Sequence, residues 1–443
     1  MNEIIYAPAT AEGLAALSVI RISGKGSDKI LKKLTKIELP KPRVMSVRTF
    51  YSNKNKTNII DRCMVVWMPG PKSYTGQDSV EIYCHGSRAV VSAFLECLES
   101  FNNLRLAKEG EFTKTALVNG KINLIEAEAI NDLIISNTEE QRKLALAQIN
   151  GNLTKPLKKW KELLLYCMAR LESNIDFSDE EDIPSEISIE KELLKLRKCL
   201  ENAIASNSSV QLIKEGIKVV LTGKANVGKS SLFNKIIKQQ KAIVANIPGT
   251  TRDILDAYIN IKGFPVILFD TAGISKSQNP IEKEGIRRAK RLIKKSDLVL
   301  NILDSTKLDE KELIKKNENK EWCVYNKSDL KKKAVKNQNM YKKVFEVSAK
   351  TEKGLEELMD NIANFASEKT NYLKKTEGVV SSIRQRRELE EAHRQINFAI
   401  KSNHIEIKAE YLRAANNRLS RVLGEIDIEE VLGDIFSNFC IGK

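Results

Sequence analysis

Hydrophobic positions follow two different spacings along this 443-residue chain, and the changes of spacing divide it into segments. Up to about Val118, short apolar runs broken by Gly and Pro predict strands, for example at Leu17–Ile22, Cys63–Met68 and Val80–Cys84. From about Asn119 to Lys214, apolar residues recur at helical spacing and predict long amphipathic helices. The expected apolar positions include Leu124, Ala127, Ile130, Leu133, Ile134, Leu144, Leu153, Leu163 and Leu171.

A third segment, from residue 216 to about 369, alternates apolar strands with helical stretches, which is typical of a parallel sheet covered by helices. The expected strands are Lys218–Thr222, Val266–Asp270, Leu298–Asp304, Trp322–Asn326 and Val344–Ser348. From Ile383 to about Leu423 the pattern is helical again. We therefore expect the α/β segment to be inserted between two halves of one helical domain.

Composition narrows the class of protein. With 42% hydrophobic and 30% charged residues, the chain matches soluble globular proteins. Its net charge of +15 favours an anionic partner such as nucleic acid, although a Lys-rich composition also arises from genomic bias. The seven cysteines form no CxxC pair, so we expect a reduced, cytoplasmic protein without a zinc site. Since no apolar stretch approaches the ~20 residues that cross a bilayer, neither secretion nor a membrane span is expected.

The strand Lys218–Thr222 runs into a phosphate-binding motif. Residues 223–230 read GKANVGKS, and the helical run Ser231–Ile237 follows, so strand, loop and helix stand in the order that a P-loop requires. Glycines let backbone N–H groups turn towards phosphate oxygens, and Lys229 can neutralise the β and γ phosphates. The hydroxyl of Ser230 can bind Mg²⁺.

Two further motifs suit the same ligand. Asp270-Thr271-Ala272-Gly273 closes a strand, where the Asp can hold the Mg²⁺ shell and the Gly can donate its N–H to the γ-phosphate. The polar loop at residues 249–253, GTTRD, could supply a Thr hydroxyl to Mg²⁺ while the γ-phosphate is present. Its other interpretation is an ordinary turn.

The base is chosen by a motif at the end of the next strand, residues 326–329, NKSD. Asp329 can accept hydrogen bonds from N1–H and the exocyclic amine of guanine, whereas adenine offers neither donor there. Residues 348–350, SAK, can complete the pocket through backbone N–H groups. Spacing and order together predict GTP binding.

Hydrolysis must differ from that of Ras-like enzymes, because Ile274 stands where they carry the Gln that orients water. Glu282 is a candidate for holding the attacking water, and its alternative interpretation is an exposed acid at a helix start. Asn226 suggests a monovalent cation that replaces an arginine finger, although an Asn in a turn can also be purely structural.

These residues resemble the MnmE (TrmE) family of bacterial tRNA modification GTPases over essentially the whole length. Further matching segments are residues 19–24 (VIRISG), 69–76 (PGPKSYTG), 109–113 (EGEFT), 119–121 (NGK) and 440–443 (CIGK). One departure is Ala225, where the resemblance leads us to expect a Pro.

The resemblance implies a multidomain fold: an α+β folate-binding N-terminal domain, an all-α helical domain and an inserted Ras-like α/β P-loop GTPase domain. The expected bounds are 1–118 for the N-terminal dimerisation domain, 119–215 and 373–443 for the two parts of the helical domain, and 216–372 for the G domain. It also implies a homodimer whose G domains meet during hydrolysis.

The resemblance further implies site residues. Arg21, Glu81, Lys121 and Lys443 would bind 5-formyltetrahydrofolate or a related one-carbon tetrahydrofolate. Asn226, Ala245, Ile247 and Thr250 would bind K⁺, Ser230 and Thr251 would bind Mg²⁺, and Glu282 would be catalytic. Cys440 would have a role in the modification, with a plain surface thiol as the alternative. The expected GTP contacts are Asn226, Val227, Gly228, Lys229, Ser230, Ser231, Ala245, Asn246, Ile247, Pro248, Gly249, Thr250, Thr251, Asp270, Thr271, Ala272, Gly273, Asn326, Lys327, Asp329, Ser348, Ala349 and Lys350.

An FAD-containing partner, MnmG (GidA), is implied as well, in a heterotetramer that adds an aminomethyl or carboxymethylaminomethyl group to C5 of uridine 34 of tRNA. The main alternative is a ribosome-assembly GTPase that binds rRNA, which the basic charge suits equally. Such relatives carry a KH-like domain, whose mark is a GxxG loop, and the sequence contains none. A third interpretation, a scaffold with an inactive G domain, is disfavoured because every motif is intact.

Overall fold

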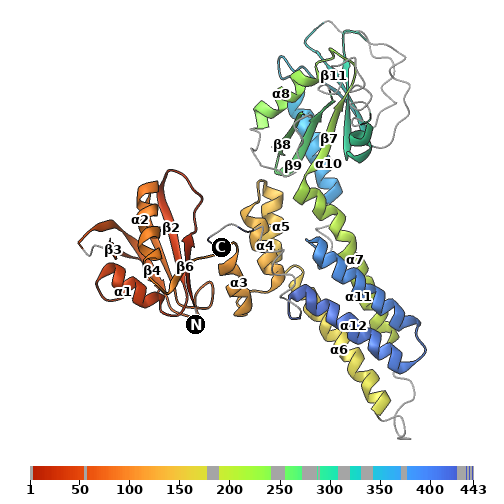
Figure 1. Cartoon of the computed structure of the whole chain (residues 1–443). Helices are drawn as coiled ribbons and strands as arrows, with labels where there is room; N and C mark the ends of the chain where they lie inside the picture. The colour runs from red at the N-terminus through yellow and green to blue at the C-terminus, as the bar shows by residue number, and fades with distance from the viewer. Residues whose placement is uncertain are drawn as a thin grey trace. The chain divides into compact units, whose positions relative to one another are not determined.

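The computed structural model describes residues 3–53, 57–176, 189–240, 255–271, 287, 290–307, 320–330, 343–370, 377–426, 436, 439 and 442. The chain divides into two compact units, Met1–Asn131 with Asn416–Lys443, and Asp132–Ala415 (Figure 1). Within the described residues, each unit contains one six-stranded sheet.

The sheet of the first unit is mostly antiparallel. Its strand order is β3-β4-β5-β2-β1-β6, and β1 and β6 pair in parallel. The predicted strands at Leu17–Ile22, Cys63–Met68 and Val80–Cys84 fall within β2, β4 and β5, so these predictions are confirmed. The strands are β1 (Ile4–Pro8), β2 (Ala15–Ser23), β3 (Ser46–Tyr51), β4 (Ile59–Met68), β5 (Ser79–Gly86) and β6 (Leu104–Leu106).

Two helices, α1 (Ser27–Thr35) and α2 (Arg88–Glu99), pack on one face of this sheet. Because side chains alternate along a strand, Ile20 and Ile22 of β2 point into this core and are fully buried. Arg21, between them, therefore belongs to the opposite face, which leaves its side chain available for a site.

The described C-terminal residues belong to the same unit. Phe436 and Phe439 pack against Leu117 and Leu124, which lie in α3 (Glu111–Val118) and α4 (Leu124–Ile134). Gly442 is buried beside Pro8, so close that a Cβ at this glycine would overlap the Pro8 carbonyl. Gly442 thus lies against β1.

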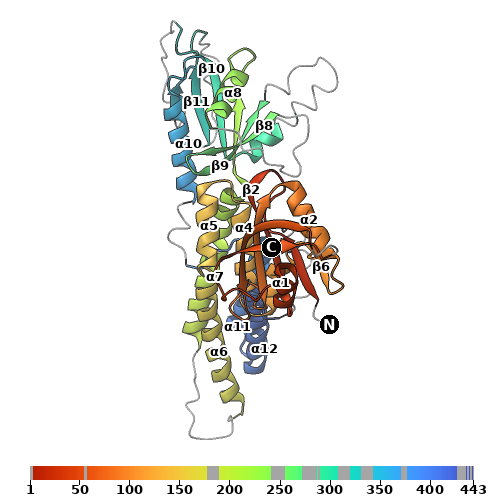
Figure 2. The same ribbon diagram turned by 90° about the vertical axis from the view of Figure 1, so that its left-hand side faces the viewer.

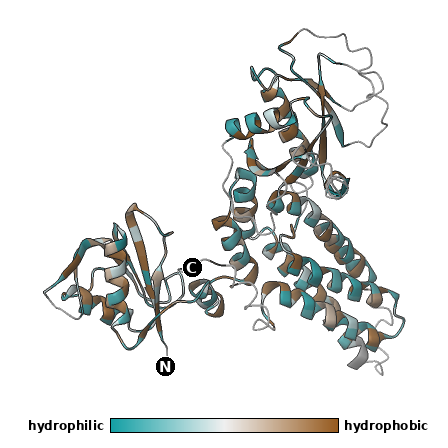
Figure 3. Cartoon of the chain, turned by 45° about the horizontal axis from the view of Figure 1, so that its top comes forward, coloured by the Kyte–Doolittle hydropathy of each residue, from teal (hydrophilic) through white to brown (hydrophobic). Residues whose placement is uncertain are grey.

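The second unit begins with a helical part. Helix α7 (Glu190–Glu215) packs against α6 (Thr154–Asp176) and α11 (Ile383–Lys401) (Figure 2). The remaining helices of this part are α5 (Glu139–Ile149) and α12 (Ile405–Leu423), and α12 continues into the first unit. Apolar and polar residues alternate around these helices, as Figure 3 shows. Among the described helices, none combines the length and the apolar character needed to cross a membrane.

The predicted helical faces are confirmed in part, because Ile130, Leu133, Ile134 and Leu144 are only half-buried. Leu153 and Leu171 are fully or almost fully buried, as are Leu124 and Ala127 in α4. The buried leucine of the middle of α6 is Leu164, with 0% exposure, whereas the predicted Leu163 is half-buried. The helix is thus rotated slightly from the expected face.

The α/β part is inserted into this helical part, as the sequence predicts. The chain leaves α7 for β7, and at the other end Ser209 of α7 donates a hydrogen bond to the Lys369 carbonyl at 3.0 Å. Further along the chain, the carbonyls of Val379 and Val380 accept hydrogen bonds from the side chains of Gln148 and Asn207, at 2.6 and 3.3 Å. The chain therefore enters and leaves the inserted α/β part beside α7. The helical part can thus continue after the insertion.

The inserted sheet has the order β12-β11-β10-β7-β9-β8 and is parallel except for its last pair. Helices α8 (Lys229–Gln240) and α10 (Leu355–Thr370) contribute to its core. The strands are β7 (Ile217–Thr222), β8 (Leu255–Ile261), β9 (Phe264–Asp270), β10 (Leu298–Asp304), β11 (Glu321–Asn326) and β12 (Val344–Glu346).

Two details differ from the sequence prediction. Strand β8 was not predicted, and it runs antiparallel to β9 because Lys262 and Gly263, both at positive φ, join the two strands in a tight hairpin. Strand β12 ends two residues before the predicted Ser348, whose N–H instead bonds the Lys353 carbonyl. That turn places Ser348 in a loop at the edge of the sheet.

Candidate functional site

The loop between β7 and α8 is shaped by close backbone approaches. Gly223 has φ 138°, and a Cβ there would overlap the Ile302 carbonyl. Gly228 has φ 92°, and a Cβ there would overlap Nδ2 of Asn326. Asn226 also adopts a left-handed conformation, with φ 64°. Both glycines are therefore needed for the turn that leads into the N-terminus of α8.

Lys229 lies inside this loop. Its Nζ donates to the carbonyls of Gly223 and Lys224 at 2.8 and 2.7 Å, and the residue is 7% exposed. Burial lowers the pKa of the Lys229 ammonium, and the charge of Asp270 opposes this effect. A cation held within the loop at a helix N-terminus suits a phosphate ligand.

Ser230, in the first turn of α8 after β7, lies beside Asp270, which ends the neighbouring parallel strand β9. Ser230 Oγ donates to Asp270 Oδ2 at 2.7 Å, and Asp270 is fully buried. Thr271, the next residue, donates from its hydroxyl to the Leu221 carbonyl at 2.8 Å. A hydroxyl beside a carboxylate is an all-oxygen donor set of the kind that Mg²⁺ prefers, so these residues fit the expected ion. Within the described residues, no group of three or more His, Cys, Asp or Glu side chains could hold a metal.

The base-recognition residues converge on the phosphate loop. Asn326 donates from Nδ2 to the Val227 carbonyl at 3.0 Å and accepts at Oδ1 from the N–H of Ala349 at 3.1 Å. One side chain thus joins the P-loop to the predicted SAK loop. Since β7, β10, β11 and β12 run in parallel, the loops after these strands meet at one edge of the sheet.

Asp329 is held by the same SAK loop. Ser348 Oγ donates to Asp329 Oδ1 at 2.6 Å, and this bond lowers the pKa of the Asp329 carboxyl, with the charge of Lys350 acting in the same direction. The carboxylate therefore stays ionised and can accept two N–H donors of a base. Ser231 is exposed on the first turn of α8.

Several expected site residues lie outside the described residues. They include three of the four residues expected to bind K⁺, one expected to bind Mg²⁺, the catalytic candidate, two residues of the DTAG motif and two at the C-terminus. These are Ala245, Asn246, Ile247, Pro248, Gly249, Thr250, Thr251, Ala272, Gly273, Glu282, Cys440 and Lys443.

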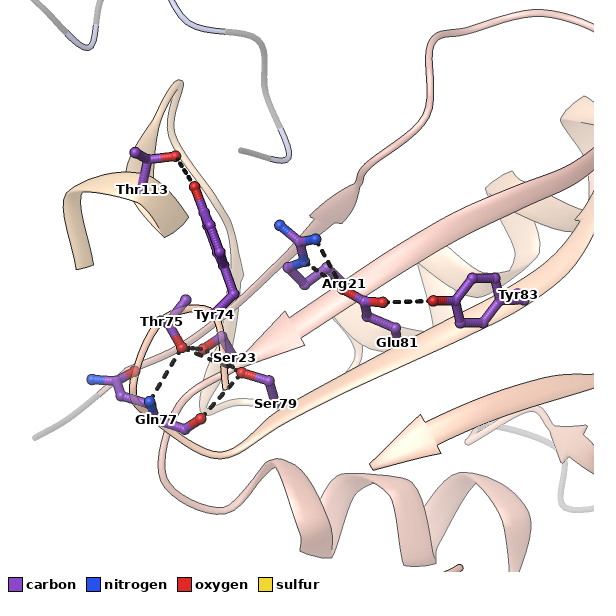
Figure 4. Close-up of polar contacts among 9 residues, drawn as sticks. All are labelled: Arg21, Ser23, Tyr74, Thr75, Gln77, Ser79, Glu81, Tyr83 and Thr113. Carbon is purple, nitrogen blue, oxygen red and sulfur yellow. Dashed lines mark hydrogen bonds and ion pairs between the residues drawn. The ribbon is translucent and has the colours of Figure 1, made fainter. Parts of the chain in front are cut away.

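A second polar cluster lies on the face of the first unit's sheet opposite α1 and α2 (Figure 4). Arg21 of β2 and Glu81 of β5 are direct cross-strand partners, and Arg21 donates from Nε and Nη2 to Glu81 Oε1 at 3.0 and 2.8 Å. Tyr83 donates from its hydroxyl to Glu81 Oε2 at 2.7 Å. Burial, helped by the bond to Glu81, raises the pKa of Tyr83 to about 12. Both carboxylate oxygens of Glu81 therefore accept hydrogen bonds.

Aromatic rings flank the same arginine. The guanidinium carbon of Arg21 lies 5.2 Å from the ring centre of Tyr74 and 5.6 Å from that of Phe112. The Tyr74 hydroxyl shares a hydrogen bond of 2.8 Å with Thr113 (Figure 4). Flat rings beside an Arg–Glu pair match the chemistry of a pterin, which has aromatic faces and a polar edge.

The loop that carries Tyr74 is fastened from two sides. The buried hydroxyls of Ser23, Thr75 and Ser79 form a hydrogen-bonded group at its base (Figure 4). Lys121 Nζ donates to the Pro71 carbonyl at 3.0 Å. The structure thus brings Lys121 to the same loop, and Gly442 lies against β1, which pairs with β2.

Sequence reasoning gave Tyr83, Tyr74 and Phe112 no role at this site. Tyr83 could have been found, because residues two apart in a strand point to the same face, and Glu81 was already a candidate. Tyr74 comes from the loop between β4 and β5 and Phe112 from the first turn of α3, so only the fold places them beside Arg21.

Family models match nearly the whole chain. Residues 4–121 match the model described as the GTP-binding protein TrmE N-terminus, and residues 124–440 match the MnmE helical domain. This chain belongs to the MnmE family. The second match covers well over half of the chain and includes the inserted G domain.

Individual members of the MnmE family align with this chain over nearly their full length. The tRNA modification GTPase MnmE of Bradyrhizobium sp. is 36% identical over 100% of this chain and 99% of its own. That of Pelagibacter ubique is 38% identical over 99% of this chain and 100% of its own. The solved G domain of the T. maritima FeoB iron transporter is 32% identical over 34% of this chain and 98% of its own, with a TM-score of 0.27.

Proposed function

We propose that this chain is a GTPase that acts in the modification of the wobble uridine of tRNA. The observation that carries the proposal is the convergence of Lys229, the Ser230–Asp270 pair and Asp329 at one edge of the inserted sheet. The full-length match to relatives named tRNA modification GTPases supports the tRNA part.

In this proposal Lys229 and the loop N–H groups bind the phosphates, and Asp329 selects guanine. Ser230, with Thr251, holds Mg²⁺, which neutralises charge on the phosphate oxygens. Lys229 is already desolvated in the loop, so it meets a phosphate without losing a water shell at that moment.

Hydrolysis is assigned to groups that replace the missing Gln. Glu282 orients the attacking water, and Asn226, Ala245, Ile247 and Thr250 bind K⁺, which stabilises the charge that develops between the β and γ phosphates. The place of Asn226 supports this, because it lies in the phosphate loop, three residues before α8 begins at Lys229.

The first unit supplies the one-carbon site. Arg21, Glu81, Lys121 and Lys443 bind 5-formyltetrahydrofolate or a related one-carbon tetrahydrofolate, and the Arg21–Glu81 pair between two aromatic rings supports this assignment. Two copies of the chain form a homodimer and associate with the FAD-containing MnmG as a heterotetramer. That partner supplies the redox step, and the reaction adds an aminomethyl or carboxymethylaminomethyl group to C5 of uridine 34. Cys440 is a further candidate in this step.

A nucleoside profile tests the proposed function. Deleting the gene should remove the modified wobble nucleoside from digested tRNA, the wild-type gene should restore it, and Lys229→Ala should not. The ribosome-assembly alternative predicts instead an unchanged nucleoside profile with an accumulation of immature ribosomal subunits. That result would overturn the proposal.

A further inference from the structure

The ammonium group of Lys327 joins two loops of the nucleotide site. Its Nζ donates to Asp304 Oδ2 at 2.6 Å and to the Asn226 carbonyl at 2.9 Å. Lys327 follows the end of β11 in a left-handed conformation, with φ 65°. Asp304 ends the neighbouring strand β10, in register with Asn326. The two strand ends therefore place Asp304 beside Lys327.

Asp304 is fixed at both of its carboxylate oxygens. While Oδ2 accepts from Lys327, Oδ1 accepts from the N–H of Thr306 at 2.9 Å and from its hydroxyl at 2.7 Å. The side chain of Asp304 is 7% exposed. Burial alone would raise its pKa, but the bonds from Lys327 and Thr306 outweigh burial and lower it. The Asp304 carboxylate is thus ionised and held in a fixed orientation beside the Lys327 ammonium group.

The same turn also holds the backbone of Lys327. Ser305 donates from Oγ to the Lys327 carbonyl at 3.0 Å, and the Ser305 N–H donates to the Asn326 carbonyl at 3.0 Å. Residues 304–306 therefore fix Lys327 at its carbonyl and at its ammonium. No motif in the sequence indicated this turn.

From this arrangement we infer that Asp304 is a positioning residue of the nucleotide site. It aims Lys327 at the Asn226 carbonyl, and this bond holds the phosphate loop in the conformation that binds guanine nucleotide. The inference rests on the proposed function, because it takes guanine nucleotide as the ligand. It adds a link between the base-recognition loop and Asn226, the residue assigned to K⁺.

A role in stability alone accounts less well for the pair. A buried ion pair gives little net stability, since the cost of desolvation offsets the attraction. Lys327 could also be satisfied by water, because its side chain is 34% exposed. Asp304 instead orients the Lys327 side chain. Without Asp304, this flexible side chain would lack the fixed acceptor that holds its ammonium group beside the Asn226 carbonyl.

The test compares fluorescent GDP and GTP binding by the full-length wild type, Asp304→Asn and Lys327→Met, each with Mg²⁺ in KCl and in NaCl. Asp304→Asn should weaken both nucleotides by roughly tenfold to a hundredfold, the effect of a lost charge-assisted hydrogen bond. Because Asp304 acts through Lys327, the double variant should bind no more than about twofold more weakly than Lys327→Met alone. The K⁺ concentration that gives half-maximal hydrolysis should rise in Asp304→Asn.

The matched control is Asp297→Asn. Asp297 immediately precedes β10, at the end of the strand away from the site, and accepts a hydrogen bond from the Lys218 N–H at 2.8 Å. It should leave nucleotide affinity unchanged. Thr306→Val, which keeps the Lys327 pair but removes one anchor of Asp304, should give a smaller loss than Asp304→Asn. Thermal unfolding of every variant separates a loss of fold from a loss of positioning.

Two results would overturn the inference: wild-type affinity in a folded Asp304→Asn, or a full additional loss when Asp304→Asn is added to Lys327→Met. Failure of the wild type itself to bind GDP or GTP is a different outcome, because it contradicts the proposed function from which the inference starts.

Discussion

Ser348 donates a hydrogen bond of 2.6 Å to the carboxylate of Asp329, and the N–H of Thr351 donates to the same Ser348 oxygen at 3.1 Å. The loop after β12 therefore orients a carboxylate that belongs to the loop after β11. Because this bond lowers the pKa of Asp329, the carboxylate is ionised at neutral pH and acts as a pure acceptor.

Base specificity follows from that acceptor. Asp329→Asn should weaken GTP binding by at least about a hundredfold, since an amide N–H would face the donors of guanine. Xanthosine triphosphate, which carries an oxygen in place of the exocyclic amine, should bind the variant better than the wild type. Competition binding with the two nucleotides measures both effects. An unchanged preference for GTP would remove the role given to Asp329.

The proposed cation site predicts that hydrolysis depends on K⁺. At equal ionic strength, the rate in KCl should exceed that in NaCl by at least about tenfold, because the ion stabilises charge that develops only in the transition state. Asn226→Ala should abolish the difference, whereas Asn234→Ala, on the exposed side of α8, should retain it. Equal rates in both salts for the wild type would exclude the proposed role of Asn226.

The Arg21–Glu81 pair predicts a loss of folate binding on substitution. Arg21→Ala should weaken 5-formyltetrahydrofolate by roughly tenfold to a hundredfold, because it removes a cation and leaves Glu81 without its charged partner. Tyr83→Phe should cost about 1 kcal/mol, the value of one hydrogen bond. Arg62→Ala, an exposed arginine of β4, is the control. Calorimetric titration that finds wild-type affinity in Arg21→Ala would speak against this site.

Thiol reactivity tests the burial of the cysteines. Burial raises the pKa of Cys84 and Cys167 to about 11 and that of Cys323 to about 12, so these thiols are protonated at pH 8. In the native protein, a maleimide should label Cys199, which is half-buried, far faster than these three. Peptide mapping after a short pulse measures the difference, and prior unfolding should remove it. Rapid native labelling of Cys84 or Cys323 would contradict the described packing.

The sequence predicted most of what depends on local pattern. The P-loop, the strands at its flanks and the loop residues Asn326 and Asp329 were identified because each motif follows a strand at a fixed spacing. Strand β8 was missed, although LDAYINI alternates and Ile259 and Ile261 are buried. The hairpin at Lys262–Gly263 pairs β8 with β9 in antiparallel orientation. We expected only parallel strands joined by helices, so this hairpin was not predicted.

Contacts between distant segments could not be predicted. Arg21 and Glu81 are 60 residues apart and face each other only because β2 and β5 pair in one register, and a shift by one residue would turn one of them to the other face. The Asp304–Lys327 pair likewise depends on the order of β10 and β11.

Guanine nucleotide binding by the purified chain tests the central claim most directly. With Mg²⁺ present, equilibrium binding should show one GDP or GTP per chain, ATP should not compete, and Lys229→Ala should lose most of the affinity. If the folded wild-type chain retained no guanine nucleotide under these conditions, the assignment of the inserted domain, and with it the proposed function, would be wrong.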